Sequence, residues 1–376
     1  MQNIYQAKGA TLIEQYNDVG RLFSESIQKS VKKIGKSRSK LLKTRQLVAE
    51  SAWDNLKDKE ICKEFIGCFV AWCGGAMITP EQGMWLMADN LSGCQTFMAR
   101  YGSGITLLHT EEDFENISMH MTGEKIIRFF EKGEMSACLV YNNLFPGAGL
   151  YGWKADLIVA VDSLFLKEDH LLEVKHPLLV NLVSWMIWRM KPEEADADKI
   201  IEMIDRLGTL IDGYAINVIR KIEARFEGYK LTLGRDESRI EYLGEDDGSF
   251  LRQVNIVEPM YEKMKSALSP KSIWRGGWKY FLNRLKVMDS HAKIYQRFSK
   301  YSLDHSELTT IHKVIHDTIS IDLSEDYINN DLGAVCVGFV DKSSTSVSLR
   351  FFDQKEDKSS IILSISRGGE MVDAHA

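Results

Sequence analysis

The sequence predicts an α+β protein in which antiparallel strands are layered against helices. Short apolar segments bounded by turn residues indicate strands, and the last three of them indicate an antiparallel meander: Ala137–Tyr141, Leu157–Val161, Tyr214–Ile219, Arg239–Leu243, Ala334–Phe339, Thr345–Phe352 and Ser360–Ile365. Blocks with helical periodicity lie between them: His176–Met190, Ala195–Ile211, Val257–Leu268, Trp278–Val287 and Ala292–Tyr301. Strands in hairpins with separate blocks of helix are typical of sheets that are covered by helices.

Composition and charge narrow the class of protein. The chain has 376 residues, of which 44% are apolar and 27% charged, and its net charge is -6. These values are typical of a globular protein and give no indication of a nucleic-acid partner. The longest uncharged run, Phe65 to Pro80, is shorter than the roughly 18 apolar residues of a membrane span. We therefore expect no transmembrane segment, and the absence of a signal-peptide pattern at the N-terminus indicates a cytoplasmic protein.

The first part of the chain is predicted to be helical. Residues 8–58 are rich in Leu, Lys, Glu, Gln and Ala and contain no Pro. Ile27, Val31 and Ile34 recur at helical spacing, while Lys29, Lys32, Lys33, Lys36, Lys40 and Lys43 fill the opposite side. We divide the chain into an N-terminal helical segment, residues 1–60, and a main domain, residues 61–376. The basic side is interpreted as a solvated helix face, and an anionic membrane or acidic partner is the alternative.

The cysteines do not indicate a metal site. The six cysteines form no CxxC pair and have no His at ligand spacing. We expect neither a metal nor a cofactor. Cys62, Cys68 and Cys73 lie in apolar helical sequence and are assigned to helix packing.

Two further local patterns have structural interpretations. Thr79-Pro80-Glu81-Gln82 predicts a helix start, with Thr79 as N-cap and Gln82 within reach of a capping box. Trp185 and Trp188, with two methionines beside them, form an apolar stripe that is interpreted as core, with the wall of an acyl pocket as the alternative.

The segment that carries chemistry begins at Gly93-Cys94. Cys94 opens a strand-like run that turns at Gly102-Ser103-Gly104 and returns as Ile-Thr-Leu-Leu-His. This pattern predicts a hairpin. Asp113 follows 19 positions after Cys94, near the end of the returning strand. Since the two ends of a hairpin lie side by side, Cys94 and Asp113 are predicted to be close neighbours.

Several segments carry a family resemblance, in the same order along the chain. They are the Gly-Cys junction with its hairpin and Asp113-Phe114, a small-residue helix upstream, Phe145-Pro146-Gly147 before a strand, the pair Ile240-Glu241, Val254-Asn255, and the late strand that ends at Phe339. Over roughly residues 60 to 365 the chain resembles the acyl-coenzyme A:6-aminopenicillanic acid acyltransferase and carcinine-hydrolase-like family of cysteine N-terminal-nucleophile hydrolases. The resemblance implies a four-layer αββα sandwich.

The resemblance also implies a mechanism and site residues. Cys94 becomes a chain terminus by autoproteolysis at Gly93-Cys94, and its free α-amino group, with a pKa of about 7.7–8.0, takes the thiol proton. Asp113 orients that amino group, and the Asn255 amide stabilises the developing oxyanion. The substrate is then an acyl amide or an acyl-coenzyme-A-like thioester, and the enzyme is an amidohydrolase or acyltransferase.

The chain departs from the family pattern at several positions. Glu111 and Phe114 stand where relatives carry Asn and Trp, and Asp162 stands where relatives often carry Asn. Val254-Asn255-Ile256 lacks the His that commonly follows Asn255, and Arg297 is matched only loosely to a family Arg on a late helix. Glu111 and Arg297 are kept as possible substrate or support residues.

Alternative interpretations remain open for each residue. Cys94 is otherwise a buried structural thiol, Asp113 an exposed turn carboxylate and Asn255 a helix cap. His109 is interpreted as structural. At the level of the whole protein, the alternative is an unprocessed binding module whose basic N-terminal helix contacts a partner or membrane surface. The substrate and the oligomeric state are not predicted.

Overall fold

The computed structural model describes residues 4–38, 40–88, 93–101, 104–112, 124–147, 151–154, 156–164, 174–223, 225–234, 238–246, 249–253, 332–340, 347–353, 358–365 and 371–374. Two large sheets and seven α-helices make up these residues, so the α+β prediction is confirmed. The helices predicted at Val257–Leu268, Trp278–Val287 and Ala292–Tyr301 lie outside the described residues.

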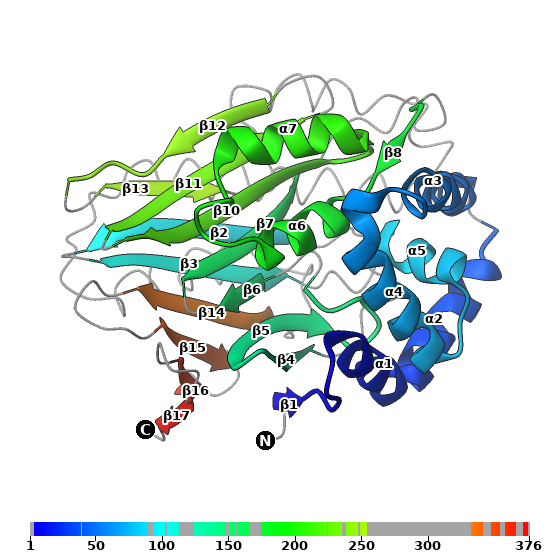
Figure 1. Cartoon of the computed structure of the whole chain (residues 1–376), viewed down its shortest axis with the longest axis horizontal. Helices are drawn as coiled ribbons and strands as arrows, with labels where there is room; N and C mark the ends of the chain where they lie inside the picture. The colour runs from blue at the N-terminus through cyan, green and yellow to red at the C-terminus, as the bar shows by residue number, and fades with distance from the viewer. Residues whose placement is uncertain are drawn as a thin grey trace, which may run out of the picture.

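The first sheet has eight strands in the order β1-β4-β5-β6-β7-β10-β11-β12. Their bounds are β1 Ile4–Gln6, β4 Glu124–Glu131, β5 Glu134–Tyr141, β6 Tyr151–Lys154, β7 Leu157–Leu164, β10 Gly213–Ile222, β11 Arg225–Leu233 and β12 Ser238–Tyr242. Neighbouring strands are antiparallel except for β1, which pairs with β4 in parallel. The amino end of the chain therefore forms an edge of this sheet (Figure 1).

The second sheet has seven strands in the order β13-β2-β3-β14-β15-β16-β17, all antiparallel. Their bounds are β13 Phe250–Gln253, β2 Gly93–Tyr101, β3 Gly104–Glu112, β14 Leu332–Val340, β15 Val347–Asp353, β16 Lys358–Ile365 and β17 Met371–Ala374. The meander predicted near the C-terminus is confirmed as β14, β15 and β16. A small parallel pair, β8 Pro177–Leu178 and β9 Thr209–Leu210, stands apart from both sheets.

The N-terminal region forms a cluster of helices beside the sheets (Figure 1). Its members are α1 Leu12–Leu22, α2 Ser24–Gly35, α3 Lys40–Leu56, the short 3-10 helix η1 Glu60–Cys62, α4 Lys63–Ala76 and α5 Pro80–Ala88. Helices α1 and α4 touch backbone to backbone, because a Cβ on Gly20 would lie 2.2 Å from the Trp72 carbonyl oxygen. The capping box predicted for α5 is confirmed: the Thr79 amide donates to Gln82 Oε1 and the Gln82 amide to Thr79 Oγ1.

Helix α2 has the amphipathic character predicted for it. Ile27, Val31 and Ile34 are buried in the core, while Lys29 and Lys32 are exposed. Because the apolar side already packs inside the protein, insertion of this helix into a lipid surface would expose core residues. The solvated-face interpretation therefore fits the packing of α2 better than insertion into a membrane does.

Helices α6, Val180–Arg189, and α7, Ala197–Leu207, cover the outer face of the eight-stranded sheet (Figure 1). Trp185 and Trp188 are 2% and 1% exposed, so the Trp stripe belongs to the core as interpreted. The Tyr16 hydroxyl of α1 donates to the Pro146 carbonyl and accepts from the Trp185 indole. One buried apolar cluster therefore joins the N-terminal helices, α6, α7 and this face of the sheet.

The inner face of the eight-stranded sheet packs on the other sheet. Met98, Ile105 and Leu107 are buried on β2 and β3, and Ile158 and Ile219 are buried on the facing strands. A Cβ on Gly228 of β11 would lie 2.5 Å from Met98 Sδ, which shows how closely the sheets approach. Among the described residues no single helix is long and apolar enough to cross a membrane.

Candidate active site

The hairpin that carries Cys94 is present. Strands β2 and β3 pair with Gly93 opposite Glu112, Cys94 opposite Glu111 and Thr96 opposite His109. The two ends of the hairpin therefore lie side by side, as predicted. Asp113 follows Glu112 directly in the chain and lies outside the described residues.

A third strand runs toward the same place. β13 pairs antiparallel with β2, from Phe250 opposite Ala99 to Gln253 opposite Thr96. It therefore advances toward the end of β2 that begins at Gly93. Asn255 is two positions beyond Gln253 in the sequence, and both Asn255 and Arg297 lie outside the described residues.

A polar cluster is buried between the two sheets beside this end of β2. The Thr96 hydroxyl and His109 Nδ1 are 2.8 Å apart across the hairpin. His109 Nδ1 is 3.8 Å from Asp162 Oδ1 on β7, in the facing sheet. The Asn217 amide of β10 donates to Asp162 Oδ2 at 2.7 Å. All four side chains are at most 3% exposed, so we call Thr96, His109, Asp162 and Asn217 the inter-sheet polar cluster.

The chemistry of this cluster is that of a desolvated acid and its partners. A buried carboxylate is costly unless hydrogen bonds compensate for the water it has lost, and the Asn217 amide supplies one such bond. The His109 ring can join Thr96 to Asp162 across the two sheets, with the direction of its hydrogen bonds set by its tautomer. The contact with Thr96 fits the structural interpretation of His109. Thr96 is two residues from Cys94, so the cluster supports the strand on which the candidate nucleophile lies.

Sequence reasoning singled out Asp162 and His109 but missed Asn217 and Thr96. Asn217 stands in the otherwise apolar run Ala215–Ile219, and a single amide inside such a run was the signal available for it. Thr96 carried no signal, because threonine is common in strands.

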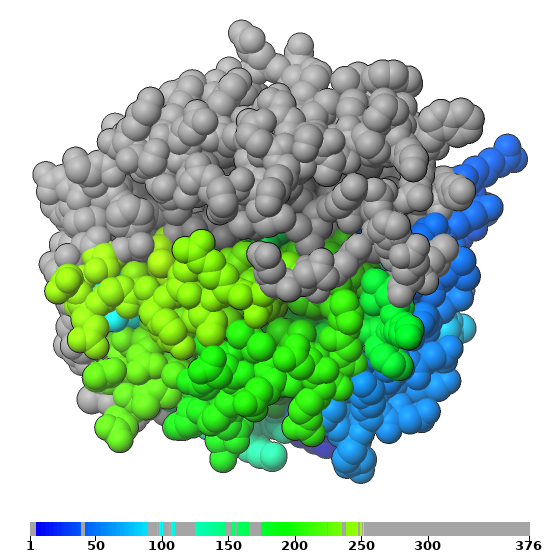
Figure 2. Space-filling view, turned by 90° about the horizontal axis from the view of Figure 1, so that it is seen from above, coloured from blue at the N-terminus to red at the C-terminus, as the bar shows by residue number. Residues whose placement is uncertain are grey.

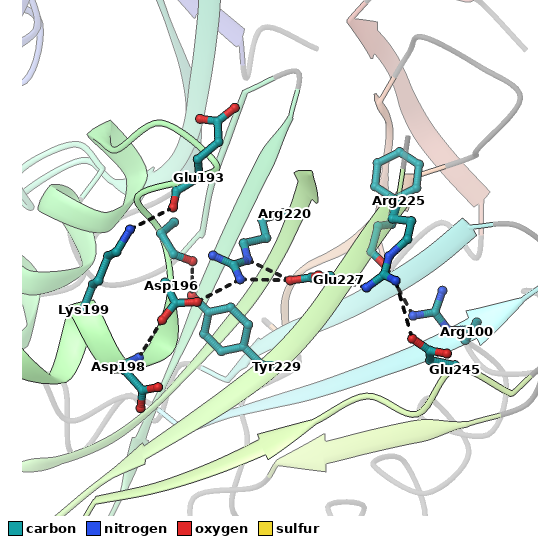
Figure 3. Close-up of polar contacts among 12 residues, drawn as sticks. Arg100, Glu193, Asp196, Asp198, Lys199, Arg220, Arg225, Glu227, Tyr229 and Glu245 are labelled. Carbon is teal, nitrogen blue, oxygen red and sulfur yellow. Dashed lines mark hydrogen bonds and ion pairs between the residues drawn. The ribbon is translucent and has the colours of Figure 1, made fainter. Parts of the chain in front are cut away.

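A second ionic network lies on the opposite, helix-covered side of the same sheet (Figure 3). Arg220 of β10 contacts Asp196 Oδ2 at 3.0 Å and Glu227 Oε2 at 2.9 Å through the same nitrogen. The Tyr229 hydroxyl donates to the Ala195 carbonyl at 2.7 Å. Asp196 is the N-cap of α7, so this network attaches the start of that helix to the sheet. Figure 2 shows the molecular surface from above, where the green to yellow-green residues of the α6–β12 region adjoin the blue N-terminal helices.

Four cysteine side chains are buried in the part of the chain that the structure describes. Burial raises the pKa of Cys62 to about 11 and that of Cys68 to about 12. The pKa values of Cys73 and Cys138 are raised further, again chiefly by burial. Since a thiol reacts as its thiolate, these four groups are inert near neutral pH. The assignment of Cys62, Cys68 and Cys73 to helix packing is confirmed by their burial.

Within the described part of the chain, no group of three His, Cys, Asp or Glu residues is arranged to hold a metal ion. No protein-family model matches the chain, and no curated protein is significantly similar to it.

Proposed function

We propose that the protein is a cysteine N-terminal-nucleophile amidohydrolase or acyltransferase with a four-layer αββα fold. The observation that carries the proposal is the register of the β2–β3 hairpin, in which Cys94 is paired with Glu111 and Gly93 with Glu112. That register brings the chain just before Asp113 to the Gly93-Cys94 bond. The sheet of the hairpin, the facing sheet and the cover of α6 and α7 on that facing sheet are compatible with three of the four proposed layers.

The first proposed step is autoproteolysis. The Cys94 thiol attacks the Gly93 carbonyl carbon, and the peptide C–N bond breaks as the new thioester C–S bond forms. The thiol proton passes to the departing nitrogen, which becomes the α-amino group of Cys94. One water molecule then hydrolyses the thioester. The products are a carboxylate on Gly93, a free thiol on Cys94 and a free α-amino group on the same residue. Gly93 suits this step because it has no side chain to obstruct the attack.

The second proposed step is acyl transfer from substrate. The Cys94 amino group takes the thiol proton, and the thiolate attacks the carbonyl of an acyl amide or thioester. The leaving amine or thiol departs with a proton, and water or an acceptor amine then resolves the acyl-enzyme. We assign Asp113 to orienting the amino group and Asn255 to the oxyanion, where one such donor contributes about 2.7–4 kcal/mol. Glu111 and Arg297 are assigned to substrate support.

The test is intact mass and N-terminal sequencing of the purified protein beside the Cys94→Ala variant. We expect two fragments, residues 1–93 and a second that begins Cys94-Gln95-Thr96, and an uncut Cys94→Ala chain. Cys138→Ala is the matched control, because it removes a buried thiol of the eight-stranded sheet and should leave cleavage intact. Iodoacetamide at pH 7.5 should then label Cys94 and leave Cys62, Cys68, Cys73 and Cys138 unmodified.

An intact chain in the unmodified protein would refute autoprocessing. The alternative would then be an unprocessed binding module. The exposed Lys29 and Lys32 on α2 favour an acidic partner in that case, because a basic face whose apolar side is buried can bind only through charge.

A further inference from the structure

A lysine amine lies beneath the end of helix α6. Lys154 of β6 is half-buried, and two residues earlier a Cβ on Gly152 would touch Trp188 of α6. Because alternate residues of a strand lie on one face, Lys154 also lies on the helix-covered face of the eight-stranded sheet. Its Nζ donates to the carbonyl oxygen of Met190, the C-cap residue of α6. The amine is therefore fixed against the end of the helix and partly shielded from solvent.

A second cation is fixed beside this amine. Arg189, the last residue of α6, directly precedes Met190, and its side chain is 18% exposed. Its Nη2 donates to Glu131 Oε2 of β4 and lies 3.4 Å from Glu64 Oε1 of α4. These two ion pairs hold the guanidinium in place. Two cationic side chains, one from the sheet and one from the helix that covers it, therefore meet at the end of α6.

These surroundings keep part of the amine uncharged near neutral pH. Burial, with repulsion from Arg189, lowers the pKa of Lys154 to about 8. The carboxylates of Glu134, Glu194 and Asp156 act in the opposite sense and do not outweigh burial. At pH 7.5 about a quarter of such amines are neutral, against roughly one in a thousand for an ordinary lysine. Since only the neutral amine is a nucleophile, Lys154 combines an available lone pair with partial access from solvent.

We propose that Lys154 is a site of N-acylation by acyl thioesters, an inference that does not depend on the proposed chemistry of Cys94. The neutral amine attacks the thioester carbonyl carbon, an amide C–N bond forms and the C–S bond breaks. The nitrogen gives one proton to the departing sulfur, which leaves as a thiol. The product amide keeps one N–H for the Met190 carbonyl. Acylation also removes the charge that Arg189 repels, so the surroundings that disfavour the ammonium ion favour the product.

The experiment compares lysines within one chain. The folded protein and its Cys94→Ala variant are incubated with S-acetyl-N-acetylcysteamine, a small acyl thioester, at pH 7.5 and at pH 9.5. Each sample is then unfolded, the remaining amines are capped with deuterated acetic anhydride, and mass spectrometry gives the light-to-heavy ratio at each lysine. Lys132, whose side chain is 89% exposed, is the solvent-exposed reference. Lys59 is the matched reference, because it is also half-buried and its Nζ donates to the carbonyl of Leu207, the last residue of α7, at 2.8 Å.

At pH 7.5 we expect Lys154 to be acetylated at least about fivefold faster than Lys132 and Lys59, in both proteins. An ordinary lysine gains its neutral form only at higher pH, so this advantage should shrink by about tenfold or more at pH 9.5. Acetylation of Lys154 no faster than that of either reference at pH 7.5, or an advantage that does not change with pH, would overturn the proposal. Loss of Lys154 labelling in Cys94→Ala would also overturn it, because the acyl group would then have come through Cys94.

Two charge variants test the cause. Glu134→Gln removes a carboxylate that favours the ammonium form, so acetylation of Lys154 at pH 7.5 should become faster by up to about threefold. Arg189→Gln removes the repulsion and should slow the reaction by about threefold or more. Thermal unfolding is measured for both, and Glu134→Gln, at the exposed start of β5, decides the matter if Arg189→Gln does not fold. Slower acetylation in Glu134→Gln, or faster acetylation in folded Arg189→Gln, would overturn the proposal.

Discussion

Gly147 is the position where the packing of α6 on the sheet gives the sharpest prediction. Its φ is +81°, in the region that favours glycine, and a Cβ there would lie 2.4 Å from Cζ3 of Trp188. Trp188 is 1% exposed and packs edge-on against Phe129, so it has little room to move. Gly147→Ala therefore introduces two separate costs, a strained backbone and an overfilled core.

Two other glycines separate these costs. Gly133 has a similar φ of +84° but nothing within 4 Å of its would-be Cβ, so Gly133→Ala should cost about 1 kcal/mol from the backbone alone. Gly152 has no positive φ, and its Cβ would lie 2.9 Å from Cδ1 of Trp188. Gly152→Ala should therefore cost about 1–3 kcal/mol from crowding alone. The sum predicts about 2–4 kcal/mol for Gly147→Ala.

The assay is urea-induced unfolding of each variant, followed by tryptophan fluorescence. The free energies of unfolding are compared between variants with the same m value, the slope of that free energy against urea concentration. Replacing Trp188 with Leu in the Gly147→Ala background should recover part of the crowding cost and none of the backbone cost. If Gly147→Ala costs no more than Gly133→Ala, then contact with Trp188 contributes nothing and the reasoning is wrong. The presence of glycine at Gly147 and Gly152 would then need an explanation other than the packing of α6.

Two further predictions concern buried polar groups. Burial, with repulsion from Arg189, lowers the pKa of Lys154 from 10.5 to about 8. Folding thus disfavours the charged amine. Between pH 8 and 10 the free energy of unfolding of the unmodified protein should therefore rise relative to that of Lys154→Met, by up to about 1.4 kcal/mol per pH unit. An equal difference in unfolding free energy between the two proteins at pH 7.5 and at pH 9.5 would contradict this. Asn217→Val removes the donor to Asp162 Oδ2 and should cost about 1.5–3 kcal/mol. The double variant with Asp162→Val should cost clearly less than the sum of the two single variants, and strict additivity in urea unfolding would show that the two side chains are not coupled.

The sequence predicted the helices and strands in which the pattern of apolar residues is clear. The strands now seen as β5, β7, β10 and the C-terminal meander were found, because apolar runs bounded by turns leave few alternatives. β12 was also found, although Arg239 and Glu241 interrupt its apolar residues. β4 and β11 were missed, since charged residues such as Lys125, Arg128 and Lys230 interrupt their apolar pattern. The N-terminal region was predicted as helical without its breaks, although Phe23 separates α1 from α2. β1 is only three residues long and was not distinguishable from a chain end.

Only the part of the candidate site that lies within the β2–β3 hairpin was predictable from the sequence. The residues that the other sheet contributes were not. The hairpin register followed from turn position and spacing, so the neighbours of Cys94 on β3 were foreseeable. Asp162 and Asn217 belong to strands of the other sheet, and their approach to His109 depends on how the two sheets stack. That stacking is set by contacts such as Gly228 with Met98, which no local pattern reveals.

The two buried polar networks of the eight-stranded sheet differ in what they do for the fold, and this difference bears on the site. Arg220 on the outer face joins the sheet to the N-cap of α7, so its burial is explained by the helix that it attaches. The contacts described for the inter-sheet polar cluster join strands to strands, and around it the sheets already pack through apolar side chains such as Met98 and Ile158. An apolar pair of similar volume would hold two sheets together at least as well as a buried carboxylate with its partners. The cluster therefore carries a cost in stability near the end of the sandwich where Gly93-Cys94 begins its strand, and the proposed function would give that cost a reason.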